Sequence, residues 1–261
     1  MNILEQIAVH KRESVKKNTQ LVPLEALKKK PLYGRSCISL RNNLEKDKAG
    51  VIAEFKRRSP SVPDLNPDAD VIKVTSEYQA AGAAGISVLT DSRYFGGSDE
   101  DLLKAREVVS LPLLRKDFII GEYQIHEAKS LGADVILLIA ALLSRKQILR
   151  FSQLAQGLGM EVLLEVHNKQ ELEESLVPSV DLVGVNNRDL KRFSVSLETS
   201  LELAAEIPED FLRISESGIE SPESIRNLRS HGYTGFLIGG NFMKTRDPGA
   251  AAGRFIKELI K

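Results

Sequence analysis

Glu54 and Lys56 are the residues of this chain that most clearly could do chemistry, because an acid and an ammonium lie two positions apart at the end of an apolar run. Residues two apart on a β-strand share one face of the sheet. If that face points into a barrel, the two groups lie side by side at the carboxyl end of the strand. The polar turn Ser59-Pro60-Ser61 follows soon after. The stretch therefore predicts a site for proton transfer beside a polar loop.

Several later apolar stretches also end in a polar residue that is in phase with the inward face. Lys116 and Glu165 each follow a leucine two positions earlier, and Asn186 and Glu216 end two further stretches. One such residue alone is usually a solvated or paired surface group. Two lysines and three glutamates on one rim are costly to hold together unless they pair or bind a substrate, so the set predicts an active site.

Glycines follow the last two apolar stretches. The chain reads Ser217-Gly218 after one and Gly239-Gly240 after the other, and the second pair is expected to open a short extra helix. Backbone amides and a helix N-terminus favour an anion, and a glycine lets the anion come close. Ordinary turn glycines would look the same in isolation. At the ends of a barrel's last two strands, however, they predict a phosphate site.

The four histidines show no spacing typical of metal ligands, and the single cysteine, Cys37, is expected to be a small apolar filler. We expect surface or capping roles for all four histidines, which are His10, His126, His167 and His231. No serine, histidine and aspartate come together at the expected rim. The chemistry must therefore depend on lysine, glutamate and asparagine, which suits proton transfer on a phosphorylated, sugar-like carbonyl compound without a metal or cofactor.

Eight short apolar stretches alternate with helical patterns between residue 51 and the end of the chain. The expected strands are Val51–Phe55, Gly85–Leu89, Leu111–Arg115, Ala133–Ile139, Glu161–Val166, Leu182–Val185, Leu212–Ser215 and Gly235–Ile238. This alternation implies a parallel sheet, and eight repeats in 261 residues predict an α/β fold, a closed (β/α)8 TIM barrel. A doubly wound open sheet is the structural alternative, but no Gly-x-Gly-x-x-Gly follows a first strand.

Residues 1–48 precede the first expected strand and form an N-terminal helical extension of a single domain, 1–261, because they are too few to bury a core of their own. Ile3–Asn18 has apolar residues at helical spacing. The basic face of this helix is expected to be solvated; it comprises Lys11, Arg12, Lys16 and Lys17.

The bulk composition narrows the class of partner. Thirty-six basic and 36 acidic residues balance to a net charge of zero, which favours neither nucleic acid nor an anionic membrane. No apolar run approaches the roughly 20 residues of a membrane span. One cysteine fits a reducing compartment, and Met1–Glu5 does not begin a signal peptide. We expect a cytoplasmic enzyme whose partner is a small phosphorylated molecule.

The sequence resembles the indole-3-glycerol-phosphate synthase family over nearly its whole length. Any one shared motif would be weak, but eight occur in order, each at the right strand. They are Ile52–Ser61, Ser87–Asp91 with Tyr94–Ser98, Leu114–Ile119, Leu137–Ala141, Leu164–His167, Gly184–Leu190, Ser215–Ile219 and Phe236–Gly240, preceded by the helix segment Ile7–Arg12.

The resemblance implies a cofactor-independent reaction of tryptophan biosynthesis. The family's substrate is 1-(2-carboxyphenylamino)-1-deoxyribulose 5-phosphate. The ring carbon that bears the carboxylate attacks the ketone, CO2 leaves, and loss of water gives indole-3-glycerol phosphate.

The resemblance also implies roles for the rim residues. Lys116 would be the general acid for the ketone oxygen, and Lys56 would pair with the substrate carboxylate. Glu165 would be a general base or stabilise the cationic ring, with Glu54 sharing the base role. Asn186 would hold a hydroxyl and a catalytic side chain. Glu216 would support them, and the substrate would contact Ser59, Phe95, Phe118, Leu137, Arg188, Ser217, Gly218, Leu237, Gly239 and Gly240.

The chain departs from the family pattern after Ser61, where Val62-Pro63 stands in place of a common Lys-Gly. This removes a cation from the loop, and the proline stiffens it. Two other interpretations remain at this point. One is a related phosphate-binding barrel such as phosphoribosylanthranilate isomerase, which would need a cysteine and aspartate pair, whereas Cys37 precedes the barrel. The other is a barrel without turnover, which the four charged residues Glu54, Lys56, Lys116 and Glu165 argue against.

Overall fold

The computed structural model describes residues 3–189 and 194–261. Met1 and Asn2, with which the signal-peptide comparison began, lie outside the described residues. So does Leu190, the last residue of one of the motifs that carry the family resemblance.

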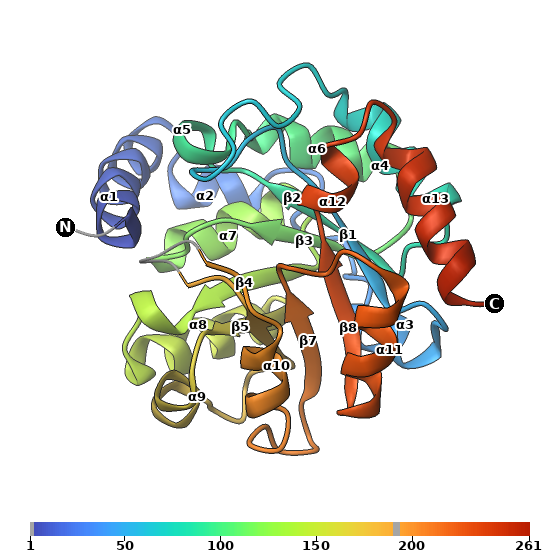
Figure 1. Ribbon diagram of the computed structural model, residues 1–261. Helices are drawn as coiled ribbons and strands as arrows, with labels where there is room; N and C mark the ends of the chain where they lie inside the picture. The colour runs from blue at the N-terminus through green and yellow to red at the C-terminus, as the bar shows by residue number, and fades with distance from the viewer. Residues whose placement is uncertain (1–2, 190–193) are drawn as a thin grey trace.

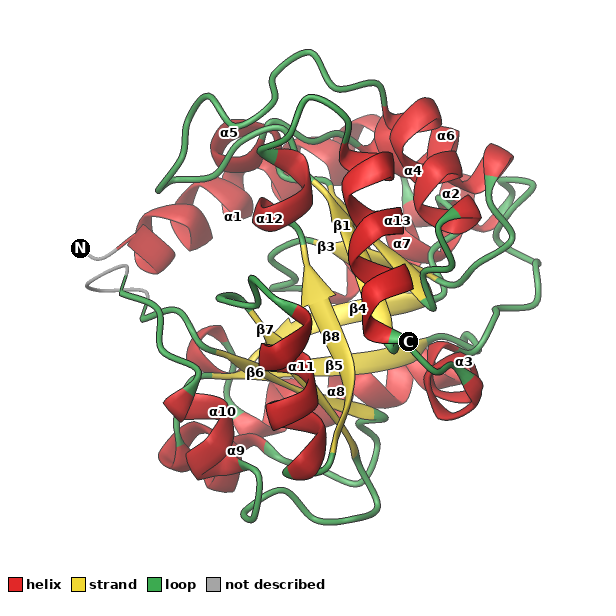
Figure 2. Cartoon of the chain, turned by 45° about the vertical axis from the view of Figure 1, so that its right-hand side comes forward, coloured by secondary structure: helices red, strands yellow, loops and turns green. Residues whose placement is uncertain are grey.

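Eight parallel strands close into a barrel in sequence order, with β1 paired to β8. The helices surround the strands (Figures 1 and 2). This confirms the expected (β/α)8 barrel. The strands are β1 Val51–Phe55, β2 Gly85–Leu89, β3 Leu113–Lys116, β4 Val135–Ile139, β5 Glu161–Val166, β6 Leu182–Asn186, β7 Leu212–Glu216 and β8 Tyr233–Ile238.

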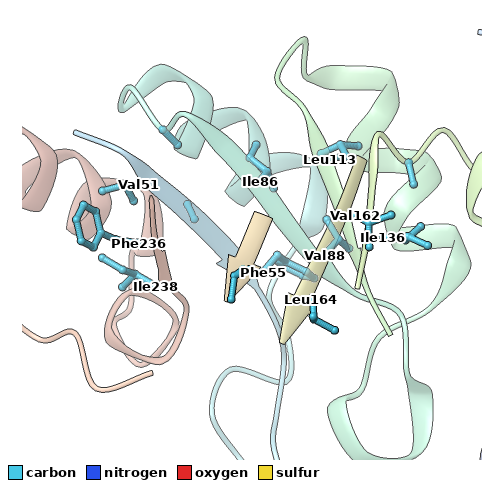
Figure 3. Close-up of a cluster of buried hydrophobic side chains, with 14 of the residues drawn as sticks. Val51, Phe55, Ile86, Val88, Leu113, Ile136, Val162, Leu164, Phe236 and Ile238 are labelled. Atoms are coloured by element: carbon cyan, nitrogen blue, oxygen red, sulfur yellow. The ribbon is translucent and has the colours of Figure 1, made fainter. Parts of the chain in front are cut away.

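Side chains alternate between the inside of the barrel and the layer beneath the helices, as the two-residue period of a strand requires. In β1, Ile52 packs inside the barrel, whereas Val51 and Phe55 pack beneath the helices. Figure 3 shows part of the layer beneath the helices, formed by alternate residues of several strands. This alternation places Glu54 on the inner face, at the carboxyl end of its strand.

Helices alternate with the strands, as the sequence predicts, and several begin at side-chain caps. The oxygens of Ser98, Ser144 and Ser221 each accept a backbone N–H in the first turn of the following helix. The barrel helices are α4 Val71–Ala80, α5 Ser92–Phe95, α6 Asp99–Val108, α7 Glu122–Ser130, α8 Arg145–Gly157, α9 Lys169–Ser175, α10 Glu198–Leu203, α11 Pro222–Ser230, α12 Gly240–Met243 and α13 Pro248–Leu259, with the 3-10 turn η1 Ala140–Leu142.

The structure differs from the sequence expectation at a few boundaries. β3 starts two residues late because Pro112 has no N–H to donate to a ladder. β6 and β7 each run one residue further, so that Asn186 and Glu216 pair across them. The short helices α5 and α10 were not expected; each is too brief for a helical period to show.

The N-terminal extension contains α1 Ile3–Leu21, α2 Leu24–Lys28 and α3 Leu40–Lys46. The expectation of a solvated basic face on α1 is wrong for Lys11, whose side chain is 10% exposed. Its Nζ lies 2.8 Å from Asp91 Oδ2 and 2.6 Å from Asp117 Oδ1. These two aspartates come from later parts of the chain, so they fix α1 against the carboxyl-end rim of the barrel. Arg12, Lys16 and Lys17 are exposed.

In the rest of the extension, α2 packs against α7, and the segment that leads into α3 covers the amino end of the barrel. Asp134, which precedes β4, is fully buried and accepts the backbone N–H groups of Ile38 and Leu113. It also pairs with Arg35, and with Arg106 at 2.8 Å. We call Arg35, Arg106 and Asp134 the Asp134 cluster. Within the described ranges, no helix is both long and apolar enough to cross a lipid bilayer.

Candidate active site

A pocket of about 480 Å³ opens at the carboxyl ends of the strands. All sixteen residues that the sequence singled out line this pocket. They are Glu54, Lys56, Ser59, Phe95, Lys116, Phe118, Leu137, Glu165, Asn186, Arg188, Glu216, Ser217, Gly218, Leu237, Gly239 and Gly240. The structure therefore brings the predicted set together at one end of the barrel. Which roles the residues have is a separate question.

Five charged side chains of the pocket form ion pairs, and we call them the mouth cluster: Glu54, Lys56, Lys116, Glu165 and Glu216. Lys56 Nζ lies 2.7 Å from Glu54 Oε1, as their shared strand face predicts. Lys116 Nζ lies 2.8 Å from Glu165 Oε2 and 3.0 Å from Glu216 Oε2. One ammonium is thus shared by two carboxylates, so the cluster has more acids than bases.

Burial and charge act in opposite directions on the pKa values of this cluster. Burial opposes the charge of Lys116, but Glu165 and Glu216 outweigh it and raise the pKa of Lys116. Burial also opposes the charge of Glu165, yet Lys116 and His167 lower its pKa to about 2. Burial, reinforced by repulsion from Glu165 and Glu54, raises the pKa of Glu216 to about 7. Near neutrality the site therefore contains a charged lysine, an ionised base and a carboxyl that can be protonated.

The turn after β7 has an unusual backbone. Ser217 has a φ of 69° and Gly218 a φ of 76°, so two successive residues are left-handed, and Ser217 is the one non-glycine among the described residues to adopt such a φ. Ser217 Oγ donates to Asn186 Oδ1 at 2.9 Å, and the same oxygen accepts the N–H of Arg188. These bonds hold the turn at the pocket edge.

Gly239 packs against the mouth cluster at the end of β8. A Cβ at this position would lie 2.3 Å from Glu54 Oε1, so any other residue here would displace the Glu54 carboxylate. The helix α12 begins at Gly240, and the first amides of a helix have no intrahelical acceptor. The expected short extra helix is therefore present, and its first turn lines the pocket beside Ser217 and Gly218.

The opposite side of the pocket is apolar. The rings of Phe95 and Phe118 lie 5.9 Å apart, and Leu137 lines the same pocket. Residues Ile3, Leu4 and Ile7 of α1 also line it. The sequence showed the apolar face of α1 but not that it would form part of the pocket wall, because periodicity does not reveal which surface a helix packs against.

A second residue that sequence reasoning missed is His167. It was expected to have a surface or capping role, yet its side chain is 11% exposed and lies between Glu165 and Glu171. The sequence feature that could have revealed His167 is its position two residues after Glu165. The histidine expectation does describe His231, which is exposed and hydrogen-bonded to Asn227 O. Among residues 3–189 and 194–261, no three His, Cys, Asp or Glu side chains are placed to hold a metal ion.

Cys37 lies at the amino end of the barrel, remote from the carboxyl-end pocket. Its Sγ is 3.7 Å from the carbonyl oxygen of Ala133, which precedes β4, and 3.0 Å from Lys129 Nζ. It packs against the core, as expected of a filler, but beside an ammonium. A reaction that needs a cysteine in the pocket, as the isomerase alternative does, is therefore not supported.

The fold and the pocket together define a (β/α)8-barrel protein with paired acids and bases at the carboxyl ends of its strands, the usual place for a barrel enzyme's active site. Comparison with known families then identifies the family. The family model described as indole-3-glycerol phosphate synthase matches residues 4–256, and the chain belongs to this family. This confirms the resemblance recognised in the sequence.

Named relatives agree with this assignment, and a solved structure agrees with the fold. The indole-3-glycerol phosphate synthase of Bacteroides thetaiotaomicron is 42% identical over 258 residues, covering 99% of each chain. That of Carboxydothermus hydrogenoformans is 44% identical, covering 95% of this chain and 97% of its own. The thiamine phosphate pyrophosphorylase of Pyrococcus furiosus has a TM-score of 0.61 at 15% identity over 85% of this chain and all of its own, which shows the fold alone.

Proposed function

We propose that this chain converts 1-(2-carboxyphenylamino)-1-deoxyribulose 5-phosphate into indole-3-glycerol phosphate, with release of CO2 and water. The chain is a lyase of tryptophan biosynthesis by family. The observation that carries the assignment of its site is the position of Lys116 between Glu165 and Glu216, at the bottom of a pocket with one apolar and one amide-rich side.

Lys116 is the general acid of ring closure. When the ring carbon attacks the ketone, negative charge develops on the ketone oxygen, and an alkoxide is a stronger base than an amine. The ammonium can therefore donate its proton even though the neighbouring carboxylates raise the pKa of Lys116. Its side chain is 12% exposed, which leaves it accessible to a substrate in the pocket.

The other members of the mouth cluster act on the remaining steps. Lys56 pairs with the substrate carboxylate until CO2 leaves, exchanging its contact with Glu54 for one with the substrate. Glu165, ionised at neutral pH, stabilises the cationic ring and takes up a proton, and Glu54 shares the base role during loss of water. Asn186 orients a substrate hydroxyl and Ser217. Glu216 holds Lys116 in place.

The substrate phosphate binds at the turns after β7 and β8. The backbone amides of Ser217, Gly218, Gly239 and Gly240 supply donors, and Ser59 adds a hydroxyl from the turn after β1. Arg188 contributes a cation at the same rim. The aromatic ring of the substrate lies against Phe95, Phe118, Leu137 and Leu237. A cytoplasmic location follows from the biosynthetic role and suits the free thiol of Cys37.

A fluorescence assay tests this function directly. The purified protein is mixed with the synthetic substrate, and the rise of indole fluorescence is followed at micromolar enzyme. We expect turnover by the native chain. The same assay with phosphoribosylanthranilate as the starting compound gives no indole signal unless an isomerase is added first. Absence of signal from the synthetic substrate would contradict the proposal.

A further inference from the structure

His167 is a buried residue that the assigned mechanism does not use. It follows β5 and precedes α9, and its ring lies between two carboxylates from different elements. Its Nδ1 is 3.0 Å from Glu171 Oε2, and its Nε2 is 3.5 Å from Glu165 Oε1. The backbone N–H of His167 also donates to Glu171 Oε2 at 2.9 Å, which fixes the position of Glu171.

These contacts determine where the ring hydrogens are. Burial and the His167 contacts oppose each other at Glu171, and the net effect lowers its pKa, so the Glu171 carboxylate is ionised and can only accept. Nδ1 must therefore carry a hydrogen. In a neutral ring the lone pair would then be on Nε2, which is buried without a hydrogen-bond partner. That lone pair would face the ionised oxygen of Glu165, which is unfavourable.

A second proton, on Nε2, removes this conflict. It converts a repulsion between a lone pair and an anion into an attraction between an imidazolium and a carboxylate. Glu165 at the end of β5 and Glu171 in α9 face the ring, and Glu216 at the end of β7 adds a further negative charge that acts on it. Burial disfavours the charge, but these groups outweigh it and raise the pKa of His167.

The second proton also alters the charge balance of the mouth cluster, which has three carboxylates and two ammonium groups. Glu165 uses its two oxygens differently: Oε2 contacts Lys116, and Oε1 faces His167. When Lys116 has given its proton to the substrate, it no longer neutralises Glu165. His167 remains as the cation beside the base.

We propose that His167 is a positioning residue, a cation held by Glu171 that keeps Glu165 ionised after Lys116 has donated its proton. In this arrangement an imidazolium lies between two carboxylates, Glu165 in the pocket and Glu171 near the start of α9. The proposal rests on the function proposed above for Glu165. The charge of His167, however, can be measured without any substrate.

NMR titration of the native protein tests that charge. The four histidines give few ring signals, and the variant His167→Asn assigns the one of interest. We expect His167 to titrate above the ordinary histidine pKa of about 6.5, and to titrate at lower pH in Glu171→Gln. A pKa at or below the ordinary value in the native protein would overturn the proposal, whatever the enzyme's activity.

Kinetics test the link to the reaction. We expect kcat of His167→Asn to fall roughly tenfold below that of the native enzyme at pH values where His167 is charged, the change equivalent to one pKa unit, with a smaller change in KM. The ratio of native to variant kcat should approach one as the pH rises through the pKa of His167. Glu216 titrates in both proteins, so its effect on the ratio cancels to first order.

A merely structural role would give a ratio that does not change with pH, and that result would overturn the proposal. In Glu171→Gln, the decrease of kcat that accompanies loss of the His167 charge at rising pH should occur at lower pH than in the native enzyme. His231→Asn is the matched control, because it makes the same substitution at an exposed histidine and should match the native enzyme at every pH. If the native chain forms no indole at all, the proposed function fails, while the titration still decides the charge of His167.

Discussion

The two ends of the barrel both contain buried charges, but they are satisfied to different degrees. At the amino end, Asp134 accepts two backbone N–H groups and pairs with Arg35 and Arg106. At the carboxyl end, Lys116 is shared by two carboxylates, and Glu216 Oε1 is buried without a hydrogen-bond partner. Both oxygens of Asp134 are thus paired, although Arg35 Nε is buried without a hydrogen-bond partner. The mouth cluster instead has three carboxylates for two ammonium groups, which leaves it with surplus negative charge.

This difference distinguishes buried charges that stabilise the fold from buried charges that can take part in a reaction. A buried charge with every partner in place stabilises one conformation, and removal of one partner leaves the other uncompensated. A buried cluster with surplus negative charge keeps shifted pKa values, as Glu216 does, and can exchange protons with a substrate. Substitutions at one end should therefore alter stability, and substitutions at the other should alter turnover.

The largest expected effect is that of Lys116→Met. Loss of a general acid commonly lowers rates by about 10² to 10⁴, and we expect a fall in kcat in this range. Binding of a phosphate-containing product analogue should persist, since the turns after β7 and β8 are intact. Lys129→Met, at a buried lysine outside the pocket, is the control and should keep native kcat. Native turnover in Lys116→Met would reject Lys116 as the acid.

Asp134→Asn should produce the converse result. The substitution keeps the shape of the side chain but leaves Arg106 buried without a counter-charge, which costs about 3–5 kcal/mol of unfolding free energy. Urea denaturation measures the loss. The kcat of the folded fraction should equal that of the native chain, because the cluster lies at the far end of the barrel. A large fall in the kcat of Asp134→Asn with unchanged stability would contradict the distinction between the two ends of the barrel.

Ser217→Asp should weaken substrate binding without altering the acid and base groups. A carboxylate beside the substrate phosphate repels it, and we expect KM to rise roughly tenfold or more. Ser217→Asn is the matched control, since asparagine has nearly the same shape, carries no charge and tolerates a left-handed backbone. Equal KM values for the two variants would contradict the assigned phosphate site.

The smallest effect concerns the pH dependence of stability. The folded-state pKa of Glu216, about 7, lies above its ordinary value of 4.5, so the folded chain holds an extra proton between these pH values. The free energy of unfolding therefore falls as the pH rises through this window, by at most about 1.4 kcal/mol per pH unit for one group. In Glu216→Gln the fall should be shallower. Urea denaturation midpoints of the native chain and of Glu216→Gln, measured between pH 4.5 and 7, test this prediction. Parallel curves of midpoint against pH would refute the raised pKa of Glu216.

Local patterns in the sequence predicted the barrel and the polar residues at its strand ends, whereas Phe95, Phe118, Leu137 and Leu237 were expected only from the family resemblance. The two-residue period determines which strand residues face inward. Because Glu54, Lys116 and Glu165 lie near the carboxyl ends of their strands, they are at the same end of the barrel. The parts that escaped prediction depend on partners distant in the chain. Lys11 is buried only because Asp91 and Asp117 lie beside it, and no pattern within α1 reveals them.

His167 escaped for a similar reason. Its spacing to Glu165 was visible, but the position of Glu171 on the next helix, which determines its charge, was not. Residues Ile3, Leu4 and Ile7 were recognised as apolar but not as part of the pocket wall. The helical period shows which residues share an apolar face, but not which part of the protein that face packs against.

The pairing of β1 with β8 has a consequence for how the chain folds. Val51 and Phe236 are neighbours in the closed barrel although most of the chain separates them. A nascent chain that has reached β7 still has an unpaired edge on β1, and such edges favour aggregation. Glu54 packs against Gly239, so the reaction chamber is assembled only once the last strand has been synthesised. Barrel closure and the onset of activity should therefore coincide in refolding kinetics.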